Sequence, residues 1–459
     1  MSFFIRGKNK VNVNNKRTKN KTFEHNKKKK KIEETKDEEI TSSEDEGITL
    51  ETEKQFSDSE DENETAQDKK LRLAKIYLQE LERLEKEKLC NEDEVDKSLI
   101  SKRLKDDYLK ETGKFKSFIA DQYSDDKLEG FDVIKCREQT GTVTCICVSS
   151  DNKYLFSGSK DGIIVKWNIE TKRKEGVLPF VKHQTPENVT GHNSKIMSIA
   201  ISTDDLYLAI GEESSNIQIW NPSTLKHIKT FKGHSKSITG VGFKKNSHIL
   251  YSCSADRSVK VWNLGEMMYV ETLFGHQDNI TSLDALYKDR VITSGSRDGT
   301  LRIWKITEES QLVYNGHSGS IDIVKLINEE CFISGGEDGQ ICLWSCMKKK
   351  PVFVIKDAHG IDPTNGQANW ICSIATLTNT DLFATGSCNG FVKLWKLGEN
   401  FRSAQFLFEI PVVGFINSLV FTLDGTKLIA SCGRDHRLGR WRTIKEVKNN
   451  IKIFSLKRK

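Results

Sequence analysis

The sequence predicts an all-β fold, a seven-bladed β-propeller that carries a helical extension and a disordered charged tail at its N-terminus. Three observations predict it. Seven tryptophans recur at intervals of 40 to 53 residues. An Asp stands six residues before five of them, and a Gly-His pair stands 27 or 28 residues before four of them. The tryptophans are Trp167, Trp220, Trp262, Trp304, Trp344, Trp395 and Trp441.

The first element, residues 1–64, is predicted to be a disordered tail because its charges are separated into blocks. Residues 1–31 hold 12 Lys and Arg and one acid, whereas residues 33–64 hold 15 Asp and Glu and two Lys. Blocks of like charge cannot bury a hydrophobic core. The basic block contains a candidate nuclear import signal that also suits RNA phosphates, with a merely solvated tail as the alternative. Its residues are Lys16, Arg17, Lys27, Lys28, Lys29, Lys30 and Lys31.

The second element, residues 65–128, is predicted to be a helical extension. Thr65 suits an N-cap, and apolar residues follow on one face at spacings of three or four. These residues are Leu71, Ala74, Leu78 and Leu81. A second amphipathic stretch runs from Val95 to Tyr108. Two interpretations remain open for both stretches: a structural collar packed on the propeller, or a docking site for a partner protein or RNA.

The third element, residues 129–459, is predicted to be the propeller, because each repeat divides into short strands separated by turn residues. In one repeat these strands cover 237–243, 249–254, 259–262 and 269–274. The segment Val133–Arg137 is expected to complete the seventh blade and close the ring, which removes exposed sheet edges. Ile451–Leu456 is a competing or additional strand.

The repeats resemble WD repeats, in which the His, the turn Asp, a strand Ser or Thr and the Trp form a buried network. A buried carboxylate needs such hydrogen bonds, so a structural role is expected for these residues rather than catalysis or metal binding. The predicted network residues are Asp161, His192, Trp220, His234, Asp256, Trp262, His276, Asp298, Trp304, His317, Asp338, Trp344, Asp435 and Trp441. The second repeat has Ser214 at the Asp position and Glu213 one place off, so an altered network is expected there.

Basic residues gather on the turns and loops predicted to share one rim of the propeller. Arginine forks suit phosphate oxygens, so these residues are candidates for binding RNA or a partner. Solvated loops and ion pairs with nearby acids are the alternative. The candidates are Lys160, Lys236, Arg257, Arg297, Arg434, His436, Arg437, Arg440 and Arg442.

Composition and motifs exclude several functions. The sequence contains no run of about 18 apolar residues, so no membrane span is predicted. The N-terminus lacks the apolar core of a signal peptide. The eleven cysteines form no Cys-x-x-Cys pair, which favours reduced thiols over disulfides or a metal site. No phosphate-binding loop, dinucleotide fingerprint or nucleophile–base pair occurs, so neither an enzyme nor a cofactor is expected.

Stretches inside and outside the repeats are similar to the family of U3 small nucleolar RNA-interacting WD-repeat proteins. They cover 64–78, 269–278, 309–322, 411–419 and 435–441. The resemblance implies a nuclear and nucleolar protein of the U3 box C/D ribonucleoprotein. It implies binding to the box B/C region of U3 RNA with a kink-turn-binding core protein. It also implies work in pre-ribosomal RNA processing beside other small-subunit processome proteins, as a monomer within the particle.

A ubiquitin-ligase substrate receptor, or another WD-repeat scaffold, is the alternative function. Receptors of the best-known kind carry Trp-Asp at the end of a repeat. None of the seven repeat tryptophans is followed by Asp, which counts against that alternative.

Overall fold

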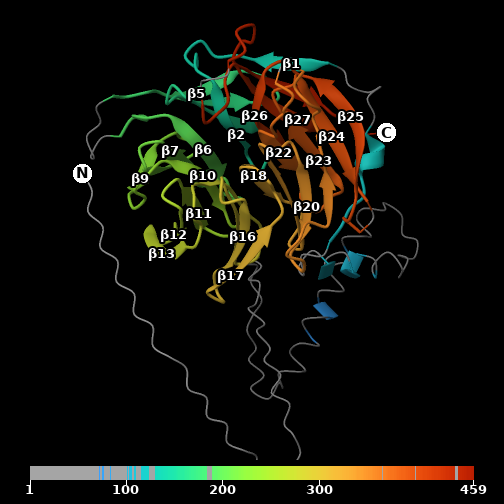
Figure 1. Ribbon diagram of the computed structural model, residues 1–459. Coiled ribbons are helices and arrows are strands. Elements are labelled where there is room, and N and C mark those ends of the chain that lie inside the picture. The colour runs from blue at the N-terminus through green and yellow to red at the C-terminus, as the bar shows by residue number, and fades with distance from the viewer. Residues whose placement is uncertain are drawn as a thin grey trace, which may run out of the picture. The chain divides into compact units, whose positions relative to one another are not determined.

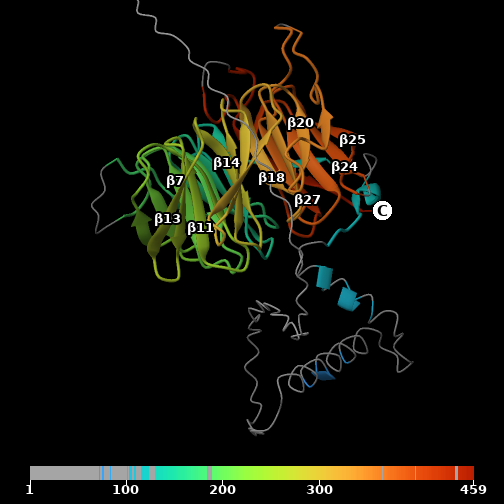
Figure 2. The same cartoon turned by 60° about the horizontal axis from the view of Figure 1, so that its bottom comes forward.

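Seven four-stranded antiparallel sheets surround a central channel (Figure 1). This computed structural model describes residues 115–123, 130–182, 189–363, 365–398, 400–439 and 443–458. Before them it describes residues 72, 75, 76, 83, 101, 103–105, 108 and 109. The predicted tail and the import signal lie outside the described residues. Figure 2 shows the sheets side by side from a second direction. The predicted fold class is therefore confirmed.

The first four blades each run from the channel outwards in sequence order. The first blade consists of β2 (Val143–Val148), β3 (Tyr154–Ser159), β4 (Ile164–Asn168) and β5 (Lys174–Leu178). The second consists of β6 (Ile196–Ile201), β7 (Leu208–Glu212), β8 (Ile217–Trp220) and β9 (His227–Phe231). The third consists of β10 (Ile238–Phe243), β11 (Ile249–Ser254), β12 (Ser258–Asn263) and β13 (Met268–Phe274). The fourth consists of β14 (Ile280–Ala285), β15 (Arg290–Gly295), β16 (Thr300–Lys305) and β17 (Ser310–Asn315).

The last three blades complete the ring. The fifth consists of β18 (Ile321–Leu326), β19 (Cys331–Gly336), β20 (Ile341–Ser345) and β21 (Phe353–Ile355). The sixth consists of β22 (Ser373–Thr376), β23 (Leu382–Gly386), β24 (Phe391–Leu397) and β25 (Ala404–Pro411). The seventh combines both ends of the propeller sequence: β26 (Phe415–Phe421), β27 (Lys427–Gly433), β28 (Asn450–Ser455) and β1 (Phe131–Ile134).

The ring closes where β1 pairs with β28, with Phe131 opposite Phe454 and Ile134 opposite Ile451. The expectation that a strand before the first repeat completes the seventh blade is confirmed, although β1 begins and ends earlier than predicted. The second candidate segment is an additional strand, not a competing one. Both segments are needed because β28 takes the third position in the sheet and β1 takes the fourth.

The seventh blade departs from the repeat at the tryptophan position. In the third blade Leu250 lies opposite Trp262, and in the seventh Leu428 lies opposite Phe454. Phe454 therefore occupies the place predicted for Trp441, which lies outside the described residues. The prediction that Trp441 ends the third strand was wrong, because residues 434–449 are inserted between β27 and β28.

Large apolar side chains fill the spaces between neighbouring sheets. Phe156 of the first blade and Trp220 of the second share one cluster, and Tyr314 and Phe332 join the fourth and fifth blades.

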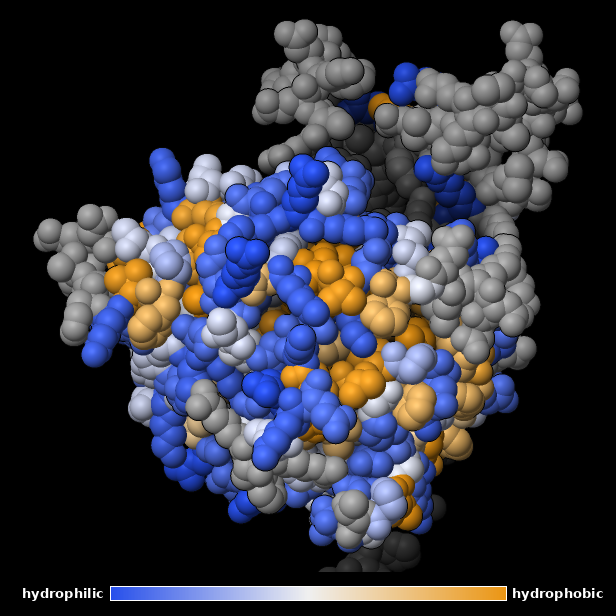
Figure 3. Space-filling view, turned by 90° about the horizontal axis from the view of Figure 1, so that it is seen from above, coloured by the Kyte–Doolittle hydropathy of each residue, from blue (hydrophilic) through white to orange (hydrophobic). Residues whose placement is uncertain are grey.

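On the face shown in Figure 3, hydrophobic residues form separate groups between hydrophilic ones. No helix in the described part of the chain is long and apolar enough to cross a membrane.

Residues 115–123 attach to the sixth and seventh blades. The buried carboxylate of Asp381 accepts hydrogen bonds from the amides of Ile119 and Ala120 at 2.8 and 3.0 Å. The hydroxyl of Tyr123 donates to the carbonyl of Gly425 at 2.9 Å. This segment contains only the short 3-10 helix η1 (Ala120–Gln122), so the helical prediction was wrong here. The described residues between 72 and 109 are helical, and their collar or docking roles stay predictions.

Candidate nucleic-acid interface

The repeated histidines and aspartates of three blades form buried hydrogen-bonded networks. In the third blade, Nδ1 of His234 lies 2.9 Å from the carboxylate of Asp256, and Nε2 lies 2.8 Å from the hydroxyl of Ser252. Trp262 donates its indole N–H to the same hydroxyl at 2.9 Å. The fourth and fifth blades repeat the set with His276, Asp298, Thr293 and Trp304, and with His317, Asp338, Ser334 and Trp344.

These networks hold their carboxylates ionised. Burial alone would raise the pKa of Asp256, but hydrogen bonds from His234, Ser258 and the Ser235 amide bring it below its ordinary value. Asp298 and Asp338 have lowered pKa values through the same kind of contacts. These hydrogen-bonded carboxylates link the turn to the strands of their own blade. Among the described residues, no group of three or more metal-ligating side chains occurs.

Two further blades keep the network with substitutions. In the first blade Gln139 stands in for the histidine and accepts a hydrogen bond from Ser157, which in turn accepts one from Trp167. The carboxylate of Asp161 accepts hydrogen bonds from the hydroxyl of Thr140 and the amide of Gly141. In the sixth blade His359 lies 2.9 Å from the hydroxyl of Thr385 and 3.1 Å from the side-chain oxygen of Asn389.

The second blade has the altered network that its sequence predicts. Ile210 lies at the position that Ser252 holds in the third blade, so no hydroxyl is present. Glu212, which is fully buried, lies 2.7 Å from His192 and accepts a hydrogen bond from Gln218. Gln218 then accepts the indole N–H of Trp220 at 3.0 Å. The substitute acid is thus Glu212, not the neighbouring Glu213, which pairs with Lys195.

Three of the residues predicted to contact RNA instead make contacts within the propeller. Lys160 is buried and forms an ion pair with Asp435 at 3.3 Å. It also donates to the carbonyls of His436 and Gly439 at 2.6 and 2.9 Å. Asp435 therefore anchors the inserted loop to the first blade, and its predicted place in a histidine network was wrong.

His436 lies buried between the rings of Trp370 and Phe415. Burial lowers its pKa to about 3, and the charges of Arg437 and Lys160 add to the effect. A neutral, enclosed imidazole cannot attract phosphate. The prediction that His436 contacts RNA is therefore contradicted by its burial.

Arg437 enters the channel from the end where the innermost strands begin. Its guanidinium donates to the carbonyls of Thr281 and Asp322 at 3.2 and 2.9 Å. Its amide donates to the side chain of Asn417 at 2.9 Å. These contacts join the inserted loop to the fourth, fifth and seventh blades. We conclude that Arg437 is a structural residue, because its donors are turned into the ring.

Four of the predicted basic residues remain exposed at one end of the propeller: Lys236, Arg257, Arg297 and Arg434. We call them the basic rim. The last three follow second strands, and the loop of Lys236 is joined to the Arg257 turn through Ser254 and Ala255. Among the described residues, none of the four has a carboxylate at ion-pair distance. The predicted candidates Arg440 and Arg442 lie outside the described residues.

Arg257 adopts a backbone conformation that an arginine rarely takes. Its φ is 70°, in the left-handed region. Three equivalent turns hold Gly162, Gly299 and Gly339, with φ between 63° and 75°, and the second blade holds Ser215 there at φ 69°. A side chain at such a position costs about 1 kcal/mol or more relative to glycine. The local structure therefore gives no reason for an arginine at this position. The sequence does carry a signal for it, because Gly follows the turn Asp at 161–162, 298–299 and 338–339, whereas Arg257 follows Asp256.

Comparison with known proteins agrees with this architecture. The WD domain, G-beta repeat family matches residues 132–168, 184–221, 225–263, 267–305, 308–345 and 361–396. The matches end before the seventh blade, where the insertion breaks the repeat. Two solved structures, "Structure of U3-55K" and "Crystal structure of RRP9 WD40 repeats", are each 46% identical to the chain and cover 73% of it. Their TM-scores are 0.68 and 0.69, with 100% and 99% of their own chains covered.

Relatives that match over most of their length extend the likeness. The mouse "U3 small nucleolar RNA-interacting protein 2" is 49% identical over 397 residues, which cover 86% of this chain and 83% of the relative. The human protein of the same name is 48% identical over the same shares. "Ribosomal RNA-processing protein 9" of Saccharomyces cerevisiae is 27% identical over 89% of this chain and 92% of its own.

Proposed function

Because the chain belongs to the family of U3 small nucleolar RNA-interacting WD-repeat proteins, we propose that it is an RNA-binding assembly component of the U3 small nucleolar ribonucleoprotein. The observation that carries the proposal is the extent of the likeness. The match spans 397 residues, a length that the propeller from Phe131 to Arg458 cannot account for alone. A match confined to the repeats would suggest only a fold.

The proposed work of this component is pre-ribosomal RNA processing during small ribosomal subunit biogenesis, in the nucleus and nucleolus. A relative named for ribosomal RNA processing supports this placement. We propose that the protein recognises the box B/C region of U3 RNA together with a kink-turn-binding core protein. One copy then contacts other small-subunit processome proteins and catalyses no reaction of its own.

The basic rim is the proposed RNA surface. Arg257, Arg297 and Lys236 are exposed cations without carboxylate partners among the described residues, so phosphate oxygens are suitable partners. Such contacts fix the position of a folded RNA and do not read its bases. Arg434 completes the set, with its guanidinium also donating to the carbonyl of Lys445 at 3.2 Å.

Immunoprecipitation of the full-length protein followed by RNA sequencing tests the proposal. We expect one abundant small nucleolar RNA to be recovered, and we expect charge reversal at Lys236 and Arg297 to reduce its recovery. Reversal at Lys226 provides a control, because this exposed lysine follows a third strand at the opposite end of its blade. Broad messenger RNA or no enriched RNA would overturn the assignment. Equal recovery from all variants would move the RNA surface away from the rim.

A further inference from the structure

The two ends of the central channel differ. At one end Arg437 bonds the carbonyl of Thr281, near the start of β14. At the other end a cavity of about 180 Å³ lies beyond Ala285, where the same strand finishes. The cavity and Arg437 are thus separated by about 13 Å along the strand. The open end is distinct from the basic rim.

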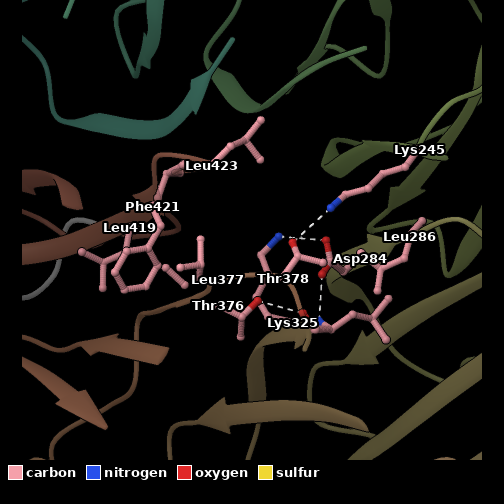
Figure 4. A pocket seen from close by; sticks show the side chains of 14 residues that line it. Lys245, Asp284, Leu286, Lys325, Thr376, Leu377, Thr378, Leu419, Phe421 and Leu423 are labelled. Carbon is pink, nitrogen blue, oxygen red and sulfur yellow. Dashed lines mark hydrogen bonds and ion pairs between the residues drawn. The ribbon is translucent and has the colours of Figure 1, made fainter. Parts of the chain in front are cut away.

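One wall of this cavity is apolar. It is formed by side chains of the sixth and seventh blades, namely Leu377, Leu419, Phe421 and Leu423. Figure 4 shows them gathered on one side of the cavity, opposite the charged groups. Leu423 is 59% exposed, although its neighbours Leu419 and Phe421 are buried. An aliphatic side chain left this open at the edge of a cavity offers a contact to an incoming apolar group.

The opposite wall carries two lysines, of which one forms an ion pair and the other does not. Lys325 forms an ion pair with Asp284 at 3.0 Å, and the second carboxylate oxygen accepts the Leu326 amide. Lys245 donates to the hydroxyl of Thr378 at 3.0 Å and lies 5.4 Å from the centre of the Tyr287 ring. Among the described residues it has no carboxylate at ion-pair distance.

The environment of Lys245 favours an anionic partner. Burial lowers the pKa of Lys245, the sign of an ammonium that has lost much of its water. A desolvated cation gains most from a carboxylate that also excludes water. Asp284 pairs with Lys325. The charges of Asp284 and Glu329 act on Lys245 from beyond ion-pair distance, which leaves its ammonium open to a carboxylate of a partner.

We propose that this end of the channel binds a short segment of a partner protein that presents one large apolar side chain beside a carboxylate. The size fits, because a cavity of about 150 Å³ accommodates a benzene ring. A protein segment fits better than RNA. The apolar wall suits an aliphatic or aromatic side chain, which a peptide presents and a phosphate backbone does not. The site goes beyond the proposed RNA function, since both ends of the channel can be occupied at once.

A random peptide library displayed on phage tests this site on the full-length protein. We expect enriched peptides to share an Asp or Glu next to a large apolar residue. A synthetic copy of the best peptide should bind Lys245→Gln and Leu423→Ser about tenfold more weakly. Changing the acid of the peptide to its amide should weaken binding to the parent protein equally, without altering the protein at all.

Two matched variants serve as controls. Lys244→Gln removes the adjacent lysine, which pairs with Asp289. Leu206→Ser changes a leucine that is 50% exposed in the corresponding loop of the second blade. Both should bind the peptide like the parent. No enriched peptide, or equal binding to all four variants, would overturn the proposal. So would a loss of small nucleolar RNA from Lys245→Gln, because the site would then belong to RNA.

Discussion

The guanidinium of Arg437 donates a 2.9 Å hydrogen bond to the backbone carbonyl of Asp322, across the central channel. Burial raises the pKa of the Asp322 carboxyl to about 6, although the charge of Arg437 acts in the opposite direction. An arginine from a basic loop thus lies across one end of the central channel. This placement separates Arg437 from Arg434, three residues earlier, which is exposed.

Replacing Arg437 by Ala should destabilise the propeller. Hydrogen bonds from a charged donor contribute about 1.5 to 3 kcal/mol, and the loss leaves the carbonyls of Thr281 and Asp322 without this donor. We expect the free energy of unfolding, measured in urea, to fall by about 2 kcal/mol. Arg434→Ala is the control and should leave it unchanged within about 0.5 kcal/mol. Equal stability of the two variants would contradict a structural role for Arg437.

The hydroxyl of Thr293 should be essential to the fourth blade. It lies 2.8 Å from Nε2 of His276 and accepts the indole N–H of Trp304 at 2.9 Å, in a fully buried position. Thr293→Val keeps the shape but leaves two buried polar groups unpartnered, so a loss of about 3 kcal/mol in unfolding free energy is expected. Thr300→Val removes a 3.5 Å contact to the same histidine and a side-chain hydrogen bond to Asp298, and it should cost under about 1 kcal/mol. A Thr293→Val protein as stable as its control would show that the network contributes little.

Acid should weaken the fold partly through His436. Its pKa falls from 6.5 to about 3 on burial. Below pH 6.5, therefore, this histidine binds a proton in the unfolded chain but stays neutral in the folded chain. The stability is therefore fully present above pH 6.5 and is lost as the pH falls towards 3. Between pH 6.5 and about pH 5 the loss is about 2 kcal/mol. His436→Met should flatten this part of the pH profile in urea unfolding. Parallel profiles for parent and variant would mean that His436 is protonated in the folded protein.

The sequence predicts best where local spacing alone determines structure. Blades three to five carry the complete His, Asp and Trp pattern, and their networks form as expected. The sequence predicts the wrong third strand for the seventh blade. Asp435 stands six residues before Trp441, as in the other repeats, but β28 takes the third position in the sheet. Nothing in the local pattern distinguishes an insertion that imitates a repeat from the repeat itself.

The candidate site was predicted only in part, for a different reason. Basic residue type and turn position identify Lys236 and Arg257 as rim residues, and both are exposed. Lys160 and Arg437 have the same residue types but point inwards. Their partners are far away in the sequence, since Arg437 reaches Thr281 and Lys160 reaches Asp435. Burial that depends on such distant contacts leaves no periodic signal in the chain.

Arg257→Gly should separate RNA binding from stability. Glycine relieves the left-handed backbone at φ 70° but adds freedom to the unfolded chain. We expect the free energy of unfolding to be unchanged or to rise by up to about 1 kcal/mol. If Arg257 contacts a phosphate, U3 RNA binding weakens, and the slope of log affinity against log salt falls by about 0.7 to 0.9.

Ser215→Gly is the matched control for this prediction, because Ser215 holds the same turn position in the second blade at φ 69° without a charge. It relieves the same backbone strain, so its stability should change like that of Arg257→Gly while RNA affinity and salt slope stay at parent values. Urea unfolding and RNA titrations at several salt concentrations measure both properties on the same samples. If both glycine variants bound RNA like the parent, the strained arginine would have no part in RNA recognition. If both lost affinity equally, the backbone shape of the turns would matter and the charge of Arg257 would not.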